Sequence, residues 1–410
     1  MKNYVIIGNG TAAAGCIEGI RSADSESKIT VISAENRPVY CRPLISYYLE
    51  GKTTIEKMNY RPEDFYEKNG CDVVYGQEAT SIDPAKKTVS LSGGAEIPYD
   101  KLCIATGSSP FVPPVEGLES VKNKFSFMTI DDALSLEHAL TPQSRVLIVG
   151  AGLIGLKCAE GICARAGSIT VCDLADRVLS SILDTDGAAM VQKKLEEHGI
   201  RFLLNDTAKS FEDGCALMAS GERVYFDVLV MAVGVRANIS IAKDAGCECS
   251  RGITVNDRLM TTVSDIYAAG DCTQAYDITS GAVKVMAIMP NAYMQGRCAG
   301  ENMAGGDSSF SNAMPMNSIG FFGLHVMTAG CFTGDMYEER TAGTLKRLFT
   351  KDNKLIGFEL IGCTDRAGIY TNMIRNQIPL DTVEFDALKK MPNLYLFGKD
   401  YCKQKLGGVV

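Results

Sequence analysis

The stretch Tyr4-Val5-Ile6-Ile7-Gly8-Asn9-Gly10-Thr11-Ala12-Ala13 decides the fold of this chain. Its first four residues predict a short buried strand, and the residues after the glycines predict a helix as far as Arg21. A second strand is predicted over residues 28–33, and Glu35 follows it. Strand, Gly-x-Gly-x-x-Ala turn, helix, strand and acid in this order indicate a dinucleotide-binding βαβ unit.

Each residue of this fingerprint has a physical role. Gly8 permits the tight turn, Gly10 lets the backbone approach a pyrophosphate, and Ala13 lets the helix pack close to the strand. The N-terminus of the helix favours the negative charge of the phosphates. Glu35 can accept hydrogen bonds from both hydroxyl groups of a ribose.

The same pattern recurs near the middle of the chain. The predicted strand Arg145–Val149 precedes Gly150-Ala151-Gly152-Leu153-Ile154-Gly155, a helix follows, and a strand over residues 168–172 delivers Asp173. Two complete units are a far more specific signal than one. An acid at the ribose position repels a 2′-phosphate, so Asp173 favours NADH; Arg177 lies close by and leaves NADPH as the alternative.

Composition excludes several classes of protein. The 410 residues are 46% apolar and 22% charged, as in globular chains, and their number predicts two or three domains. The net charge of −8 argues against nucleic acid as a partner, because an acidic chain repels phosphates. No apolar run approaches the roughly 20 residues of a membrane span. Glycines interrupt the apolar residues at the N-terminus, so no signal peptide is expected.

The cysteines are numerous but scattered. There are 15 of them, and no Cys-x-x-Cys occurs. This distribution is typical of reduced thiols and predicts a cytoplasmic protein. Neither the cysteines nor the three histidines have the spacing of iron–sulfur or zinc ligands, so no metal site is expected.

Three further segments lead to a family resemblance. They are Ala105-Thr106-Gly107 after a predicted strand, residues 227–236 with Gly234, and residues 265–271, which end in Gly270-Asp271. In this order, together with the two βαβ units, they resemble the flavoprotein reductases with two dinucleotide-binding domains, the pyridine nucleotide-disulfide oxidoreductase superfamily. The resemblance implies that the first unit binds FAD, with Asp271 on the ribityl chain, and that the second unit binds NADH.

The resemblance also implies the architecture. It is an α/β fold of two Rossmann-like dinucleotide-binding domains, for FAD and NAD, with a smaller α+β C-terminal interface domain. The split FAD domain would take residues 1–110 and 235–311, the NAD(P)H domain 111–234, and the interface domain 312–410. A helix that begins near Asn291 would point its N-terminus at the flavin, where reduced flavin carries charge.

The segment Tyr40-Cys41-Arg42-Pro43-Leu44-Ile45-Ser46 resembles the Y-x-R-P-x-L-S motif of rubredoxin and ferredoxin reductases and of the flavin part of nitrite reductases. These enzymes have no redox cysteines, and the resemblance places Arg42 and Pro43 at the FAD site. It implies that hydride passes from NADH to FAD and that electrons then leave to an iron-containing protein. The acceptor would be a free rubredoxin or ferredoxin, or iron–sulfur partner subunits of a complex in which this chain is the electron-input subunit. A homodimer stays open.

Cys41 supports a different reading of the same segment. In the branch of peroxidases, oxidases and CoA-disulfide reductases, one cysteine lies just before a Leu-Glu-Gly-Lys-like segment, and Pro43 holds that position here. Cys41 lies two residues away, so an NADH oxidase or CoA-disulfide-type reductase that uses Cys41 is an alternative function. Cys41 is otherwise a buried thiol, because free cysteine often behaves as a small apolar residue.

Two positions depart from the motif of the rubredoxin and ferredoxin reductases. That branch usually has a lysine after the motif serine and a glutamate in the NAD helix, and these positions hold Tyr47 and Lys157 here. Our hypothesis is that Lys157 supplies positive charge near the flavin, which would stabilise anionic reduced flavin. The alternative is that Lys157 is a solvated helix residue.

Overall fold

The computed structural model describes residues 1–212, 214–398, 401 and 403. The chain divides into two compact units, each of which is assembled from separate segments. The first unit comprises Met1–Ser180, Leu195–Ala275 and Val283–Ser311, and the second comprises Ser181–Lys194, Tyr276–Ala282 and Asn312–Val410. The three domain boundaries predicted from the sequence stay a prediction.

A five-stranded parallel sheet in the first unit carries the first βαβ unit. Its strand order is β18-β7-β1-β2-β3. The central strands are buried along nearly their whole length, as expected for a parallel sheet that is covered on both faces. The strands are β1 Asn3–Ile7, β2 Lys28–Ser33, β3 Cys71–Tyr75, β7 Lys101–Ile104 and β18 Ile266–Ala268.

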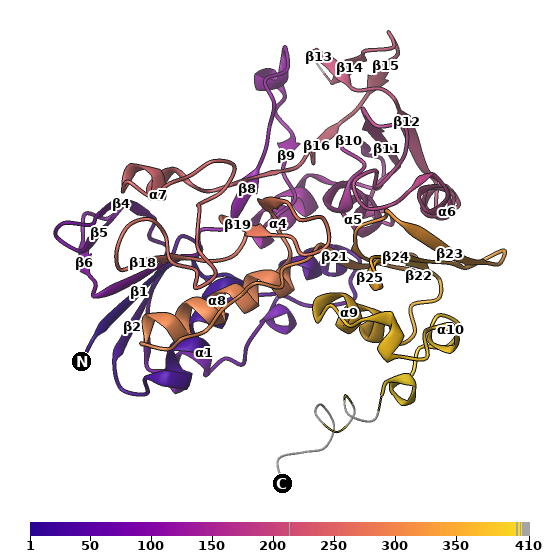
Figure 1. Ribbon diagram of the computed structural model, residues 1–410. Coiled ribbons are helices and arrows are strands. Elements are labelled where there is room, and N and C mark those ends of the chain that lie inside the picture. The colour runs from indigo at the N-terminus through magenta and orange to yellow at the C-terminus, as the bar shows by residue number, and fades with distance from the viewer. Residues whose placement is uncertain (213, 399–400, 402, 404–410) are drawn as a thin grey trace. The chain divides into compact units, whose positions relative to one another are not determined.

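Two helices that are far apart in sequence pack side by side on this sheet: α1 (Thr11–Ala23) and α8 (Met289–Met303) (Figure 1). Glycines line their contact, and a Cβ on Gly296 would lie 1.9 Å from the carbonyl oxygen of Ala12. A Cβ on Gly15 would lie 2.3 Å from the carbonyl oxygen of Tyr293. Only glycine allows backbones to approach so closely. Part of the glycine content of the chain therefore serves helix packing.

A second five-stranded parallel sheet in the first unit has the order β12-β11-β10-β16-β9. Thr129 and Asp132 form a capping box that begins α4. The strands are β9 Lys124–Phe125, β10 Arg145–Val149, β11 Ser168–Asp173, β12 Ile200–Leu204 and β16 Val228–Met231. The helices of this part of the first unit are α4 Ile130–Ala139 and α5 Leu153–Ile162. Helix α6, Thr185–Glu196, lies mostly in the segment Ser181–Lys194 of the second unit.

Shorter elements complete the first unit. The outward crossing β8 (Ser108–Pro110) pairs antiparallel with the return crossing β17 (Val235–Ala237). Two three-stranded antiparallel sheets flank the parallel ones: β4 Ala79–Asp83, β5 Thr88–Leu91, β6 Glu96–Pro98, and β13 Ala208–Glu212, β14 Cys215–Met218, β15 Arg223–Tyr225. The remaining elements are α2 Ile45–Leu49, α3 Phe65–Lys68, α7 Ser240–Asp244, β19 Gln274–Tyr276 and β20 Val283–Val285.

The second unit is built on an antiparallel sheet of order β21-β22-β25-β24-β23. Asp352 and Asn353 have φ of 50° and 59°, so the β24–β25 hairpin turns with the positive φ angles that a tight hairpin favours. The elements are β21 Met316–Phe321, β22 Leu324–Gly330, β23 Asp335–Arg340, β24 Leu345–Lys351, β25 Lys354–Ile361, α9 Ala367–Arg375 and α10 Phe385–Leu388.

A buried arginine ties segments of the second unit together. The side chain of Arg347 is 6% exposed and forms ion pairs with Asp184, with Asp186 at 2.6 Å and with Glu338 at 2.6 Å. Glu359 is fully buried, and its nearer carboxylate oxygen lies 3.6 Å from the same guanidinium. Burial raises the pKa of Glu359 to about 7, since the low-polarity interior disfavours the charged form.

Two Rossmann-like parallel-sheet cores in a mixed α/β chain confirm the predicted fold class. Within the described part of the chain, no helix combines the length and the apolar character that crossing a membrane requires.

Candidate functional site

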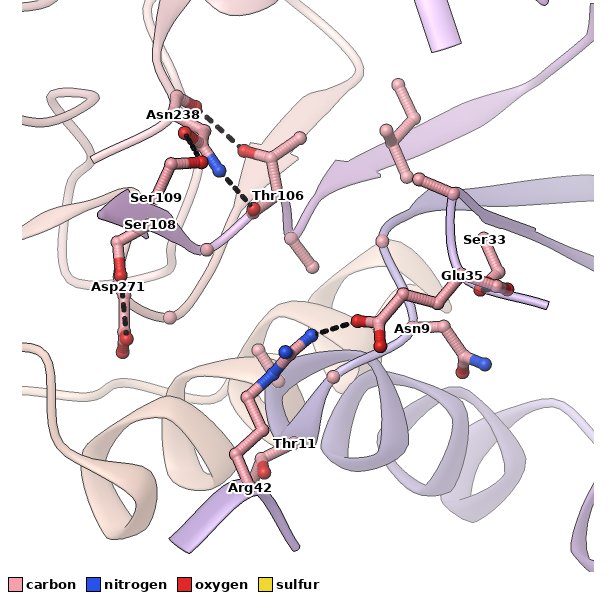
Figure 2. Close-up of a pocket in the computed structure, with 18 of the residues that line it drawn as sticks. Asn9, Thr11, Ser33, Glu35, Arg42, Thr106, Ser108, Ser109, Asn238 and Asp271 are labelled. Atoms are coloured by element: carbon pink, nitrogen blue, oxygen red, sulfur yellow. Dashed lines mark hydrogen bonds and ion pairs between the residues drawn. The ribbon is translucent and has the colours of Figure 1, made fainter. Parts of the chain in front are cut away.

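A cleft of about 490 Å³ lies at the carboxyl ends of the strands in the first parallel sheet (Figure 2). Ligands of open α/β sheets bind at this edge. The cleft collects residues from segments that are distant in sequence. Among its lining residues are the predicted Gly8, Gly10, Glu35, Arg42, Ala105, Thr106, Gly107, Gly270 and Asp271.

The first glycine turn is shaped to receive a ligand rather than a side chain. Gly8 has φ of 109°, and a Cβ there would lie 2.2 Å from the carbonyl oxygen of Ala105. Gly10 caps α1 without a side-chain hydrogen bond, and open space surrounds the position of its missing Cβ. Ala13 is fully buried behind the turn. The N-terminus of α1 therefore presents backbone N–H groups and the positive end of the helix dipole to the cleft.

A small hydrogen-bond network occupies one end of the cleft. The hydroxyl of Tyr40 donates to Glu35 at 2.8 Å. Arg42 forms an ion pair with the same carboxylate (Figure 2). The guanidinium of Arg42 also lies 5.1 Å from the centre of the Tyr40 ring. Arg42 thus places a cation in the cleft, and Glu35 keeps lone pairs that can accept from ligand hydroxyls.

Asp271 lies at another part of the cleft wall. Ser108 donates to its carboxylate at 3.4 Å, and burial raises the pKa of Asp271 (Figure 2). The turn that carries it is fixed from α8, because Gln295 accepts from the backbone N–H of Gly270 at 2.7 Å. A carboxylate that is buried in this way is stabilised by hydroxyl donors from a ligand.

The two crossings between the parallel sheets are locked together beside the cleft. The side chain of Asn238 donates to the carbonyl of Thr106 at 2.9 Å, and the hydroxyl of Thr106 donates back to the carbonyl of Asn238 at 2.8 Å (Figure 2). Ser109 adds a third bond to Asn238 at 2.8 Å. Sequence reasoning missed Asn238, which lies two residues after the segment 227–236 that contributes to the family resemblance.

The second glycine turn repeats the geometry of the first. Gly150 has φ of 115°, and a Cβ on Gly155 would lie 2.0 Å from the carbonyl oxygen of Gly150. Open space surrounds the missing Cβ of Gly152, which caps α5. Asp173 accepts from the N–H of Ala151 at 2.7 Å, so its carboxylate is held beside the turn. Leu153 and Ile154 are half-buried in the first turn of α5.

Lys157 lies on α5 in a nearly closed environment. Its ammonium forms an ion pair with Glu160 and lies 4.0 Å from Glu50 and 4.7 Å from the centre of the Tyr47 ring. The side chains of Lys157 and Glu160 are 13% and 3% exposed. Lys157 is therefore not a solvated residue of an exposed helix face. It links α5, the helix of the second βαβ unit, to residues 45–52, which follow the first βαβ unit in sequence.

Several predicted residues lie outside the two turns. Cys41 is half-buried, and burial raises the pKa of its thiol. Pro43 belongs to a short 3-10 turn, Arg42–Leu44, that leads into α2. Asn291 is buried in the first turn of α8. Gly234 has φ of 116° and lies between β16 and β17.

The residues of the cleft fit FAD. Backbone N–H groups at a helix N-terminus and the cation of Arg42 suit a diphosphate, and the carboxylates of Glu35 and Asp271 suit sugar and ribityl hydroxyls. The open space beside Gly10 is a cradle that a side chain would fill. Among the residues that the structure describes, no group of three or more His, Cys, Asp or Glu side chains could hold a metal ion.

Comparison with known proteins identifies relatives over most of the chain. The family model "Pyridine nucleotide-disulphide oxidoreductase" matches residues 2–296. The NADH-dependent phenylglyoxylate dehydrogenase subunit epsilon of Aromatoleum evansii is 31% identical over 86% of this chain and 87% of its own. The NADH oxidase of Methanocaldococcus jannaschii is 30% identical, with 87% of each chain covered. The crystal structure of NADH:rubredoxin oxidoreductase from Clostridium acetobutylicum matches with a TM-score of 0.75 and 26% identity, covering 95% of this chain and 99% of that one.

Proposed function

Because the chain belongs to the pyridine nucleotide-disulphide oxidoreductase family, we propose that it passes electrons from NADH through FAD to an iron-containing protein. Its membership makes it an FAD-dependent NAD(P)H oxidoreductase. The proposal concerns the nucleotide that it prefers, the acceptor and the residues that act. The observation that carries it is the presence of two complete glycine turns, each at the carboxyl edge of its own parallel sheet.

FAD supplies the chemistry, because the bound flavin takes up a hydride and gives up electrons one at a time. The residues of the chain hold it. The N-terminus of α1 and Arg42 bind the diphosphate, Glu35 accepts from ribose hydroxyls, and Asp271 accepts from the ribityl chain. The lock between Thr106 and Asn238 keeps the wall of the cleft in place.

NADH is the preferred donor because of Asp173. Its carboxylate is held by backbone N–H groups of Ala151 at 2.7 Å and Ala175 at 2.8 Å. An acid fixed at this position accepts from ribose hydroxyls and repels the 2′-phosphate of NADPH. Arg177 is paired with Asp176 at 2.7 Å, which engages the nearby cation that would otherwise attract that phosphate.

The acceptor is a one-electron iron protein. The chain has no Cys-x-x-Cys, and Ser46 stands where a second cysteine would complete a Cys-x4-Cys pair with Cys41. The relatives named above include a rubredoxin oxidoreductase and a subunit of a larger dehydrogenase, so the acceptor is a free rubredoxin or ferredoxin, or iron–sulfur partner subunits. Persistent co-purification with cluster-bearing chains would favour the second form.

Lys157 supplies positive charge between the two cofactor units. It is the cation of α5 that faces the segment 45–52, and the ring of Tyr47 lies against its ammonium. A cation in a site with little water stabilises the negative charge that develops when the flavin is reduced. Glu160 accepts from the ammonium and Glu50 lies 4.0 Å from it, so these two carboxylates hold the lysine in its orientation.

An NADH oxidase or CoA-disulfide-type reductase that works through Cys41 is the second candidate, and the relative from Methanocaldococcus jannaschii favours an oxidase. A nucleophilic cysteine needs a lowered thiol pKa, whereas burial raises the pKa of Cys41. Because the pKa of Cys41 is raised rather than lowered, the rubredoxin- or ferredoxin-type function is the preferred candidate.

Anaerobic mixing of the FAD-loaded protein with NADH or NADPH tests the proposal. We expect NADH to bleach the flavin absorbance faster than NADPH does. Oxygen, a disulfide such as CoA disulfide, rubredoxin and ferredoxin are then offered in turn as oxidants of the reduced protein. Rapid reoxidation by an iron protein supports the proposal; reoxidation by oxygen or disulfide alone, in a manner that Cys41→Ser abolishes, overturns it in favour of the second candidate.

A further inference from the structure

The short helix α2 (Ile45–Leu49) is the joint between the two dinucleotide units. It follows directly on the 3-10 turn that begins with Arg42, which lines the FAD cleft. Helix α5 begins at the second glycine turn. A Cβ on Gly161 of α5 would lie 3.0 Å from the carbonyl oxygen of Ser46, so the two helices touch along their backbones. The position of α2 on α5 therefore determines how the cleft residue Arg42 lies relative to the second glycine turn.

Polar contacts hold this joint from the side of α4. The hydroxyl of Tyr48 on α2 donates to Glu137 at 2.8 Å, and Arg165, just after α5, forms an ion pair with the other oxygen of Glu137 at 2.8 Å. Arg165 also donates from Nε to the carbonyl of Leu49 at 2.5 Å, at the end of α2. The carboxylate of Glu137 thus accepts one hydrogen bond from α2 and one from Arg165, which follows α5. The guanidinium of Arg165 also links this carboxylate to the end of α2.

We propose that Tyr48, Glu137 and Arg165 are positioning residues for hydride transfer, because they fix α2, which follows the cleft-lining residue Arg42, against the helix that begins at the second glycine turn. This inference rests on the proposed function. None of the three lines the FAD cleft, so they act through the placement of α2. Hydride transfer depends steeply on the separation of donor and acceptor, and a misplacement of about 1 Å can cost on the order of 100-fold in rate.

The contacts resemble those of a clamp rather than of a surface ion pair. Arg165 and Glu137 are 36% and 24% exposed, which alone would make the pair a weak contributor to stability. The pair is tied at both ends, however, by the Tyr48 hydroxyl and the Leu49 carbonyl. The network therefore fixes the position of α2 against α5 even where its contribution to the free energy of unfolding is small.

Tyr48→Phe and Glu137→Gln test the proposal in the FAD-loaded protein. We expect both variants to bind FAD stoichiometrically and to bind NAD⁺ within about twofold of wild type. The rate of flavin reduction by NADH in stopped flow should fall at least fivefold. The long-wavelength charge-transfer absorbance of reduced flavin with NAD⁺ should weaken, because it depends on the stacking of the two rings. The slowing in the double variant should be smaller than the product of the two single effects, since both changes weaken contacts of one carboxylate.

Matched controls are available at exposed sites. Tyr225→Phe changes an exposed tyrosine, and Glu222→Gln removes an exposed ion pair with Arg201. Both should keep the wild-type reduction rate and absorbance. Wild-type rates and absorbance in Tyr48→Phe and Glu137→Gln, with only a lower Tm, would leave the network a structural role and overturn the positioning proposal alone. If NADH and NADPH both fail to reduce the wild-type flavin, the proposed function and this inference fall together. Should Glu137→Gln fail to fold, Tyr48→Phe decides, because it removes a single hydroxyl.

Discussion

The ammonium nitrogen of Lys157 lies 4.7 Å from the centre of the Tyr47 ring. Lys157 lies on α5, the helix that begins at the second glycine turn, and Tyr47 lies on the short helix α2. Lys52 approaches the same ring at 5.6 Å, so two cations face one aromatic side chain. Contacts between cations and aromatic rings gain strength where water is excluded, and the low exposure of Lys157 meets that condition.

Replacement of Lys157 by methionine should therefore slow hydride acceptance. We expect flavin reduction by NADH to fall about tenfold or more, because a fixed positive charge that stabilises developing negative charge is lost. The midpoint potential of the flavin should fall by tens of millivolts, where about 30 mV corresponds to 1.4 kcal/mol for a two-electron couple. Stopped-flow absorbance and a spectroelectrochemical titration measure the two quantities. Lys28→Met, at an exposed ion pair with Asp72, is the control. A wild-type rate and potential in Lys157→Met would remove the lysine from the mechanism.

Cys41→Ser should leave turnover intact. Burial raises the pKa of the Cys41 thiol, so little thiolate is present near neutral pH to act as a nucleophile. We expect unchanged NADH turnover with an iron-protein acceptor and slow reaction of Cys41 with iodoacetamide, followed by mass spectrometry of the modified peptide. Cys249, which is also half-buried, serves as the comparison thiol. Loss of turnover in Cys41→Ser would instead support the oxidase or disulfide reductase reading.

The local patterns of the sequence were sufficient for the elements that build the two sites. The glycine turns, with their positive φ at Gly8 and Gly150, follow from residue type alone. Only glycine tolerates the close approach to the backbone that follows the neighbouring strand of the sheet. The strand and helix periods then place Glu35 and Asp173 at the strand ends. These features are encoded within about 30 residues of chain, the length of one βαβ unit.

Contacts between distant segments could not be predicted in the same way. Asn238 reaches Thr106 across 132 positions, and Glu137 receives Tyr48 across 89. Asp184 lies just before α6 and Asp186 in its first turn, and both pair with the buried Arg347 across 163 and 161 positions. Such pairings depend on which elements meet in the fold, and a single sequence without aligned relatives carries no record of that. The Lys157 hypothesis came from comparison with a family motif, and its contact with Tyr47 became visible only in three dimensions.

Asp173→Ser should weaken the preference for NADH. The shorter, neutral side chain no longer repels a 2′-phosphate and loses the carboxylate that accepts from ribose hydroxyls. We expect KM for NADH to rise about tenfold and the ratio of kcat/KM for NADH over NADPH to fall by a larger factor, measured by steady-state kinetics with each nucleotide. Glu212→Gln, at an exposed pair with Arg223, should change neither value. An unchanged ratio in Asp173→Ser would show that another group selects the nucleotide.

Glu359 should make the second unit less stable as pH rises. The pKa of Glu359 is about 7 in the folded chain, whereas the pKa of an unfolded glutamate is about 4.3. Between these values the folded state holds a proton that the unfolded state releases, so the contribution of Glu359 to stability is fully present below about pH 4 and is lost as pH approaches 7. The change amounts to about 4 kcal/mol, because each pKa unit is worth about 1.4 kcal/mol.

Glu359→Gln isolates this contribution, because glutamine cannot titrate. Subtracting wild-type Tm from variant Tm at each pH cancels the other titrating groups, and we expect this difference to increase by several degrees between pH 5.0 and pH 7.5. Calorimetry of the FAD-loaded proteins measures it. Glu222→Gln, whose carboxylate pairs with Arg201 at an exposed site, should give a difference that does not change with pH. If the difference for Glu359→Gln is also constant, Arg347 keeps Glu359 ionised in the folded chain, and the buried cluster does not take up a proton on folding.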